Sequence, residues 1–236
     1  MLVKFLFYII ISITWPVYPQ ASAQFDHTHA AKPGCNQWCG SWPIPYPFGM
    51  NDPECSADKW FEIECRNTSG DQTPYLKYIN MEVTAFGTSI VWIKNPIYRR
   101  NCSRSKDVGD IINLEGGPFV YSQVATTLHF CNRMGQRSVA VRGNDQCGYA
   151  LIVARYQGSK YDYLFVGDDL RDLDNVDAVL EWEILNNSTL KLPANAYSRC
   201  YPTNITSSSG WRCTCLDGFD GNPYIGGGCV EGMIQL

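Results

Sequence analysis

The chain has 236 residues, with 19 lysines and arginines against 23 aspartates and glutamates, and a formal net charge of −4 at pH 7. This acidic balance excludes a general nucleic-acid binder, which needs a strongly basic face. The eleven cysteines, in a chain that we expect to be exported, indicate a disulfide framework, so we predict no metal and no cofactor. Because eleven is odd, at least one thiol is free or pairs with another chain.

Residues 1–23 have the features of an export signal. Lys4 supplies the positive charge, residues 5–13 the apolar core, and Ala21-Ser22-Ala23 the cleavage site, so we predict cleavage after Ala23. The alternative is a membrane anchor, but the apolar run is shorter than the roughly 20 residues that cross a bilayer. We therefore expect a secreted protein with no membrane span after signal removal, beginning with a flexible tail over residues 24–34.

A proline-rich segment opens the mature chain after the first cysteines. In residues 43–49, prolines alternate with Ile44, Tyr46 and Phe48. Because proline fixes φ and favours an extended preceding residue, the three apolar side chains should project to one side. We interpret the segment as a structural strap over a sheet rather than as a direct ligand contact.

The hydrophobic pattern is that of β-structure. Residues 59–65 alternate, with Phe61, Ile63 and Cys65 on one face. Residues 176–185 fit either a helix or a strand. This spacing indicates an antiparallel sandwich or an irregular meander. The other predicted strands cover residues 75–86, 89–93, 119–130, 138–141, 149–156 and 161–166.

The composition changes after a predicted boundary between residues 184 and 200. We expect a cysteine-rich β domain over residues 35–185, a polar linker over 186–199 and a small module over 200–236. The small module is rich in Gly, Ser and Thr and too short to bury a sufficient core, so disulfides must hold it together. Its cysteines are Cys200, Cys213, Cys215 and Cys229.

Asn-x-Ser/Thr sequons mark expected surface turns and glycosylation sites. Two of them overlap, so both are not expected to carry sugar, and a disulfide at Cys102 would block the sequon that contains it. The sequons start at Asn67, Asn101, Asn186, Asn187 and Asn204.

Three segments together resemble the galacturonan-binding extracellular region of plant wall-associated receptor kinases. The first is the series Cys35-x-x-x-Cys39-Gly40, Ile44-Pro45-Tyr46-Pro47-Phe48-Gly49, Cys55 and Phe61-Glu62-Ile63-Glu64-Cys65; the second is Val179-Leu180-Glu181-Trp182-Glu183-Ile184; the third is Gly218-Phe219-Asp220-Gly221-Asn222-Pro223-Tyr224. The resemblance implies a mainly β fold, in which a disulfide-stabilised antiparallel domain precedes a partial EGF-like module. No residues match a kinase glycine-rich loop, catalytic lysine or H-R-D loop, so we expect no kinase activity.

The resemblance leaves part of the disulfide map open. Cys215–Cys229 would be the terminal disulfide of the EGF-like module. The earlier cysteines that Cys200 and Cys213 would normally pair with are missing, so either these two pair with each other or one reaches back to the first domain. Only Cys102, Cys131 and Cys147 lie between Cys65 and Cys200, fewer than in the family.

The resemblance also implies pectin, a galacturonate polymer, as the ligand. Arginine and lysine pair with carboxylates, and aromatic rings cover the apolar faces of sugars. The best local match is a basic run without acidic residues: Trp92, Lys94, Tyr98, Arg99, Arg100, Arg104 and Lys106. The alternative is a solvated loop. A weaker candidate comprises Arg133, Arg137 and Arg142, whereas the acidic stretch over 162–183 should repel a polyanion.

No catalytic set is evident. The chain has no G-x-S-x-G or H-E-x-x-H motif, and nothing indicates a pair of glycosidase carboxylates. We therefore expect a non-catalytic extracellular protein at the plant cell wall that binds de-esterified pectin or oligogalacturonides. The alternative is a secreted protein-interaction module, a partner or decoy of full-length receptors, which the EGF-like piece and the odd cysteine favour.

Overall fold

The computed structural model describes residues 31–68, 70–100, 112–132, 148–154, 174–188, 190 and 196–232. For residues 98–100, 127–132, 148–151 and 153–154 only the backbone is described. Within these ranges the protein is mainly β, with short 3-10 turns and four disulfides, which confirms the predicted fold class. No helix among the described residues has the length and hydropathy to cross a membrane.

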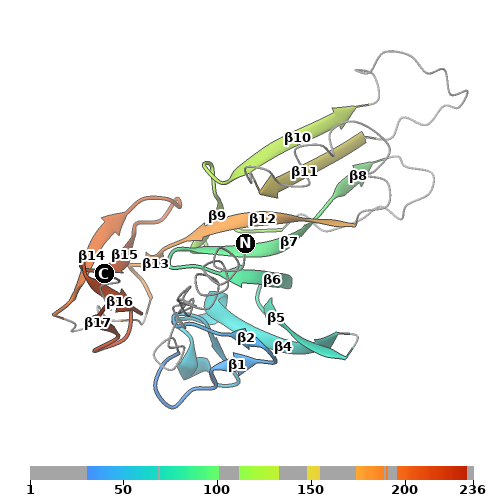
Figure 1. The fold of residues 1–236 in the computed structure, drawn as a ribbon. Coiled ribbons are helices and arrows are strands. Elements are labelled where there is room, and N and C mark those ends of the chain that lie inside the picture. Colours follow the sequence, from blue (N-terminus) through green and yellow to red (C-terminus); the bar gives the residue numbers. More distant parts are fainter. Residues whose placement is uncertain are drawn as a thin grey trace, which may run out of the picture.

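A seven-stranded sheet forms the centre of the molecule (Figure 1). Four consecutive strands make an antiparallel meander, as the strand spacing predicted, and β12, the segment that fitted either helix or strand, joins its far side. In spatial order the strands are β3 (Gly49–Met50), β4 (Glu62–Thr68), β5 (Asp71–Leu76), β6 (Met81–Phe86), β7 (Ile90–Pro96), β12 (Asn175–Trp182) and β9 (Phe119–Tyr121).

Two smaller sheets flank this centre. The first consists of β10 (Thr126–Asn132), β11 (Gly148–Ala154) and β8 (Tyr98–Arg100), and Figure 1 shows it beside β7 and β12. The second is a short ribbon of β1 (Trp38–Cys39) and β2 (Trp42–Pro43) near β4 and β5. Strands predicted over 138–141 and 161–166 lie outside the described residues.

Local turns interrupt the predicted strands at several points. Residues 59–61 form a 3-10 helix, η3 (Lys59–Phe61), because the carboxylate of Asp58 accepts a hydrogen bond from the Trp60 amide at 2.8 Å. The predicted strand 75–86 is interrupted by a turn that ends at Asn80, whose φ is 55°. Asparagine tolerates this left-handed conformation better than most residues. The predicted strand 119–130 is likewise divided into β9 and β10.

The proline-rich segment is a strap that contributes its apolar side chains to the core, as expected. Ile44, Tyr46 and Phe48 are all buried. The Phe48 ring lies at the centre of an aromatic cluster, with centroids 5.3 Å from Phe61 and 5.8 Å from Trp182, both edge-on. Such edge-to-face pairs add to the stabilisation from apolar burial. The strap is therefore part of the hydrophobic core.

Gly49 ends the strap at a point where no side chain fits. A Cβ on this residue would lie 2.2 Å from the carbonyl oxygen of Cys55. The obstacle is backbone and cannot rotate away. This close approach lets β3 pair in parallel with β4, next to the 3-10 helix η2 (Pro53–Cys55).

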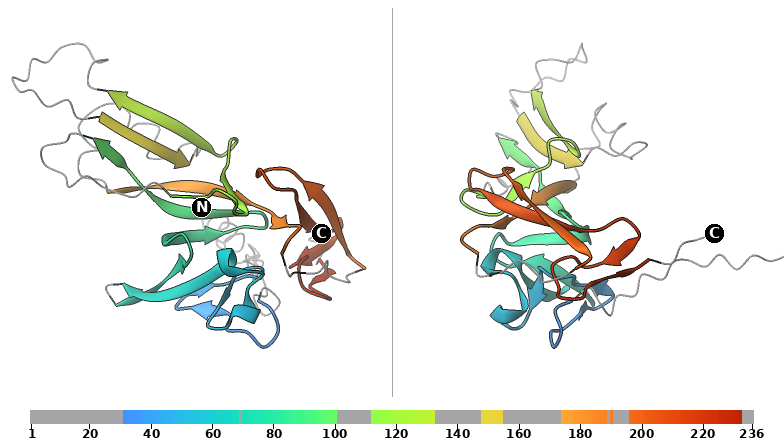
Figure 2. Two further views of the ribbon diagram at one scale, coloured as in Figure 1. Left: turned by 180° about the vertical axis from the view of Figure 1, so that it is seen from behind. Right: turned by 90° about the vertical axis from the view of Figure 1, so that its left-hand side faces the viewer.

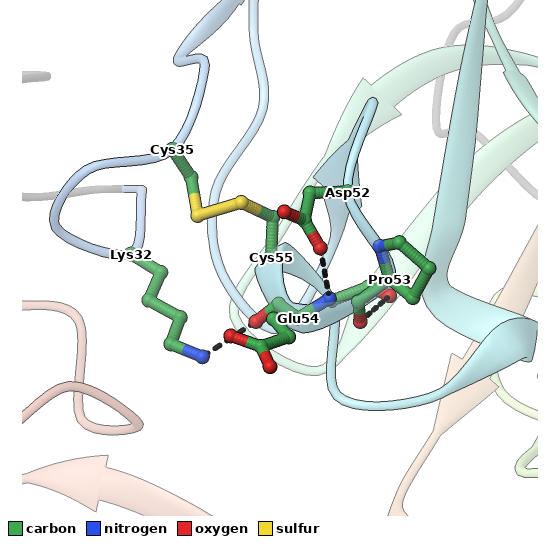
Figure 3. Close-up of a disulfide and its surroundings, with 7 residues drawn as sticks. Lys32, Cys35, Asp52, Pro53, Glu54 and Cys55 are labelled. Carbon is green, nitrogen blue, oxygen red and sulfur yellow. Dashed lines mark hydrogen bonds between the residues drawn. A yellow bond between two sulfur atoms is a disulfide. The ribbon is translucent and has the colours of Figure 1, made fainter.

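Two disulfides hold the strap region to the sheet. Cys35 is bonded to Cys55, and Cys39 to Cys65 on β4. Figure 3 shows the first bond beside η2, where the Asp52 carboxylate accepts the Glu54 amide at 2.9 Å and Lys32 reaches the Glu54 carbonyl. Cys102 and Cys147 lie outside the described residues, and only the backbone of Cys131 is described.

The C-terminal module is a pair of small sheets joined to the end of β12 (Figures 1 and 2). Cys200 pairs with Cys213 directly across two strands, which resolves the alternative left open by the sequence. Cys215–Cys229 is present, as the resemblance implied. The strands are β13 (Ile184–Leu185), β14 (Ser198–Thr203) and β15 (Gly210–Cys215), then β16 (Phe219–Gly221) and β17 (Cys229–Glu231).

The module is held to the first domain by specific polar contacts as well as by strand pairing. The side-chain amide of Asn222 donates to the backbone carbonyl of Tyr46 in the strap at 2.6 Å. The Arg212 Nε donates to the backbone carbonyl of Trp182 at 2.6 Å. The Tyr224 ring packs 5.3 Å from the Trp182 ring, and burial raises the pKa of Tyr224 to about 12. The Gly-Asn-Pro-Tyr stretch (residues 221–224) thus connects the C-terminal module to the first domain.

Candidate functional site

A groove of about 670 Å³ lies beside the meander. Its volume falls in the range of small-molecule sites, roughly 300–1,000 Å³. We call it the aromatic groove. Its lining comes from η3, the turn between β5 and β6, strands β5, β6 and β7, the loop before β9 and the first residue of β12: Trp60, Tyr75, residues 78–82, Lys94, Pro96, Ile112, Asn113, Glu115 and Asn175.

Aromatic side chains form one wall of the aromatic groove. The rings of Trp60 and Tyr78 are 4.3 Å apart and tilted by 56°. Trp60 is placed by the capped turn η3 and is backed by Gly117, where an added Cβ would lie 2.6 Å from the indole. Tyr78 is 51% exposed because it sits on the turn that interrupts the predicted strand. An exposed ring beside a fixed indole provides the kind of surface on which sugar rings stack.

Cations lie against these aromatic rings. The Lys59 ammonium is 4.4 Å from the Tyr78 ring centre and donates to its hydroxyl at 3.3 Å. The Arg66 guanidinium lies 4.2 Å from the Tyr75 ring centre. Both distances are within the range of cation–π attraction. The groove therefore combines aromatic surface with positive charge.

Two basic side chains beside the groove, Arg66 and Lys94, are paired with carboxylates or amides. Arg66 Nη1 donates to Asn80 at 2.7 Å, and its Nε donates to Glu64 at 2.7 Å. Lys94 on β7 forms an ion pair with Glu82 on β6. The other oxygen of the Glu82 carboxylate accepts the Tyr75 hydroxyl at 3.1 Å. The groove is thus a network of matched charges rather than a purely basic surface.

A second carboxylate faces Lys94 from β12. Asp177 is the direct neighbour of Lys94 across the strand pair. Burial raises the pKa of the Asp177 carboxyl, Glu82 raises it further, and the nearby Lys94 ammonium opposes both effects. Lys94 therefore lies between two acidic side chains that the linear sequence does not place near it.

The structure divides the basic run predicted from the sequence. Trp92 is half-buried on β7, and of the two side chains of the run that the structure describes, only that of Lys94 lines the aromatic groove. Tyr98, Arg99 and Arg100 lie on β8, which pairs with β11 in a different sheet, and only their backbone is described. Arg104 and Lys106 lie outside the described residues, as do Arg133, Arg137 and Arg142. Their role in binding stays a prediction.

Four of the predicted glycosylation sites are on the described surface. Each asparagine is exposed, which an acceptor requires, and the fifth, Asn101, lies outside the described residues. Asn67 is near the end of β4, where its side-chain oxygen accepts the Gly70 amide at 3.2 Å. Whether they carry sugar stays a prediction. The four are Asn67, Asn186, Asn187 and Asn204.

Sequence reasoning missed the aromatic wall. Trp60 and Tyr78 are 18 positions apart and were assigned to predicted strands, so no local run of aromatic and basic residues marked them. The only available signal was the repeated placement of a cation close to an aromatic residue, as in Lys59-Trp60 and Lys77-Tyr78. Within the described part of the chain, no group of three or more His, Cys, Asp or Glu is placed to hold a metal ion.

Comparison with known proteins identifies the region that contains the aromatic wall of this groove. Residues 35–93 match the family described as wall-associated receptor kinase galacturonan-binding. The chain resembles the extracellular region of wall-associated receptor kinases. Trp60, Tyr75 and Tyr78 lie inside the range that matches the galacturonan-binding family, whereas the basic run extends beyond it from Lys94 onward. No solved structure matches the chain.

Several Arabidopsis thaliana proteins share this similarity. Wall-associated receptor kinase-like 17 is 39% identical over 100 residues, covering 39% of this chain and 12% of that protein. Wall-associated receptor kinase-like 10 is 29% identical over 157 residues, covering 54% of this chain and 20% of that protein. A putative wall-associated receptor kinase-like 13 is 35% identical over 104 residues, covering 37% and 14%. The chain thus spans about an eighth to a fifth of these relatives.

Proposed function

We propose that this protein is a non-catalytic, extracellular carbohydrate-binding protein of the plant cell wall, and that its ligand is pectin or an oligogalacturonide. The family match over residues 35–93 supports galacturonan as the ligand class. Disulfides within the matched range support an oxidising, extracellular compartment.

The observation that carries the proposal is that the aromatic wall of the groove lies within the matched range. Trp60 and Tyr78 offer ring faces for the apolar sides of sugars, and Lys59 stands beside them as a cation for a uronate. A groove open to solvent suits an extended polymer. The proposal assigns the aromatic groove, rather than the basic run alone, as the pectin-binding site.

Retention on immobilised pectin of mixed esterification tests this assignment. Tyr78→Ala removes the exposed wall of the groove and is expected to reduce retention strongly. Tyr201→Ala is the matched control, because Tyr201 is a tyrosine of similar exposure (41%) in the C-terminal module. Equal losses in the two variants, or no retention of the unmodified protein, would contradict the assignment.

The basic run is tested by the same measurement. A variant with Arg99→Ala and Arg100→Ala keeps the aromatic groove intact. If this variant loses retention while Tyr78→Ala keeps it, the pectin site lies on the run and not in the groove.

A second function, protein interaction, is favoured by one surface of the C-terminal module. The rings of Tyr197 and Phe219 are stacked 4.3 Å apart, and Tyr197 and Val230 are exposed. Exposed aromatic residues of this kind are common at protein interfaces. A complex with a receptor would support this alternative if it is lost in Tyr197→Ser. Non-reducing electrophoresis detects a disulfide-linked complex, and co-purification detects a non-covalent one.

A further inference from the structure

The 3-10 turn η3 carries two of the side chains that meet at Tyr78. The Lys59 ammonium lies 4.4 Å from the centre of the Tyr78 ring, and the centroids of the Trp60 and Tyr78 rings are 4.3 Å apart. The third residue of the turn, Phe61, is buried in the core. Successive residues of a 3-10 helix are about a third of a turn apart, so a rotation of η3 moves all three side chains together. The orientation of η3 therefore decides whether the indole and the ammonium face Tyr78.

The residue that caps this turn is Asp58. The backbone carbonyl of Asp58 accepts the Phe61 amide at 3.1 Å. Its carboxylate accepts the Trp60 amide at 2.8 Å, one of the N–H groups that a helix leaves without a partner at its start. Two consecutive amides of the turn thus donate to the same residue, which fixes the rotation of η3.

Asp58 is itself anchored to the first domain. The buried Ser56 hydroxyl donates to the Asp58 carbonyl at 3.1 Å, and the Ala57 amide donates to the Pro47 carbonyl of the strap at 2.9 Å. Burial raises the pKa of the Asp58 carboxyl, and the hydrogen bond from the Trp60 amide opposes this effect. The carboxylate is thus half-buried between the strap and the turn that it caps.

The Trp60 indole fits closely against a second element. Gly117, in the loop before β9, lies so near that an added Cβ would be 2.6 Å from the ring. The Gly117 amide donates to the Leu114 carbonyl at 3.1 Å, which holds this loop in a turn. The indole therefore contacts Gly117 as well as Tyr78, and a rotation of η3 would disturb both contacts.

We propose that Asp58 is the positioning residue of the aromatic groove, which holds the Trp60 indole and the Lys59 ammonium against Tyr78 without lining the groove itself. This inference rests on the proposed function, because it concerns the same groove. Pectin binding then depends on a carboxylate that the ligand does not touch. The role of Asp58 requires an acceptor oxygen at the right place and not the negative charge of the carboxylate.

Two substitutions of Asp58 separate the acceptor from the charge. Asp58→Asn keeps an oxygen at the same reach, and asparagine caps helices as well as aspartate does. Asp58→Glu keeps the charge but displaces the acceptor by one methylene group. On immobilised pectin of mixed esterification, Asp58→Asn is expected to bind at least as tightly as the unmodified protein. Asp58→Glu is expected to bind about fivefold more weakly, the ratio that corresponds to the loss of one cap. Equal losses in both variants, or full binding by Asp58→Glu, would overturn the inference.

The cap of the other 3-10 turn provides a matched control. The Asp52 carboxylate accepts the Glu54 amide at 2.9 Å and caps η2 in the same way (Figure 3). The described lining of the groove includes no residue of η2. Asp52→Glu is therefore expected to leave pectin binding unchanged. A loss as large as that of Asp58→Glu would mean that capping affects binding only through general stability, which contradicts a positioning role.

A Trp60→Ala background shows whether Asp58 acts through the turn. In this background Asp58→Glu should weaken pectin binding clearly less than it does in the unmodified protein, because the indole that the cap positions is absent. Full additivity of the two losses would mean that Asp58 affects binding by another route, and would overturn the inference.

The order of the indole can also be measured without a ligand. The Trp60 contribution to the near-ultraviolet circular dichroism, which reports fixed tertiary packing, is the difference between each protein and its Trp60→Phe counterpart. It should be retained in Asp58→Asn and reduced in Asp58→Glu, and an unchanged contribution in Asp58→Glu would overturn the inference. Failure of the unmodified protein to bind pectin would instead overturn the proposed function, and this measurement would still decide whether Asp58 positions Trp60.

Discussion

Asp177 shows how a single residue depends on neighbours that are distant in the sequence. It lies on β12 opposite Lys94, and the Lys94–Glu82 pair lies on the next two strands. Burial is the largest influence on the Asp177 carboxyl and raises its pKa above 3.8. A carboxyl with a raised pKa in the folded state binds its proton more tightly there than in the unfolded chain. The stability that protonated Asp177 contributes is therefore lost as the pH rises from the unfolded-state pKa through the raised folded-state pKa.

Replacing Asp177 with asparagine tests this balance. Asp177→Asn keeps the shape and removes the charge, so we expect higher thermal stability than the unmodified protein near neutral pH. The stability difference should shrink as the pH falls through the raised pKa. It should disappear below about 3.8, where the Asp177 carboxyl is protonated in both the folded and the unfolded state. Thermal unfolding followed across this pH range measures it, with Asp217→Asn as an exposed control. Destabilisation at neutral pH would mean that attraction to Lys94 outweighs burial.

The sequence predicted that Lys94 belongs to a binding site, but not which side chains surround it. The absence of acidic residues around Lys94 in the linear sequence suggested an open cation. Strand pairing then placed Glu82 and Asp177 beside it, and pairing partners cannot be deduced from local composition. For the same reason, the proximity of Trp60 and Tyr78 depends on how η3 packs against the β5–β6 turn.

At the scale of elements, hydrophobic periodicity predicted faces more reliably than boundaries. Phe61 and Ile63 are buried, as the alternation over 59–65 indicated. The alternation could not show that Asp58 would cap a 3-10 turn at the same place. The turn between β5 and β6 has no glycine or proline, and Tyr78 and Ile79 continue the apolar pattern through it, so only Asn80 marked the break.

The strap places one of the largest fully buried side chains, Phe48, in the core. Phe48 is 1% exposed and contacts the rings of Phe61, Phe119 and Trp182. Phe48→Ala is expected to lower the free energy of unfolding by about 3–5 kcal/mol, the usual cost of such a cavity. Denaturant unfolding measures the change. Phe48→Leu, which retains most of the volume, should cost clearly less, and equal costs would argue against a packing role.

At the scale of the whole molecule, the two modules share one core and one set of polar contacts. Trp182 packs against the strap residue Phe48 on one side and against Tyr224 of the C-terminal module on the other. The fully buried Glu183 accepts hydrogen bonds from the hydroxyls of Thr203 and Thr206, at 2.6 and 2.5 Å. The C-terminal module has only two disulfides. We infer that docking on the first domain supplies the remaining stability of this small piece.

Asn222 provides the test of this coupling. Its side-chain Nδ2 donates to the buried backbone carbonyl of Tyr46, 176 residues away in the sequence. Its side-chain oxygen accepts a hydrogen bond from the backbone N–H of Tyr224. Asn222→Ala leaves the Tyr46 carbonyl without this donor, so we expect a loss of about 1–3 kcal/mol in the free energy of unfolding. Asp220→Ala, at an exposed position on β16 just before Asn222, should cost much less.

The form of the transition matters as much as its midpoint. If the modules are coupled as the contacts indicate, unfolding of the unmodified protein followed by calorimetry and by near-ultraviolet circular dichroism should give one coincident transition. Asn222→Ala should shift that transition to lower temperature or divide it, with the C-terminal module unfolding first. Two separate transitions in the unmodified protein would mean that the modules fold independently. In that case the contacts of the Gly-Asn-Pro-Tyr stretch would not couple the unfolding of the C-terminal module to that of the first domain.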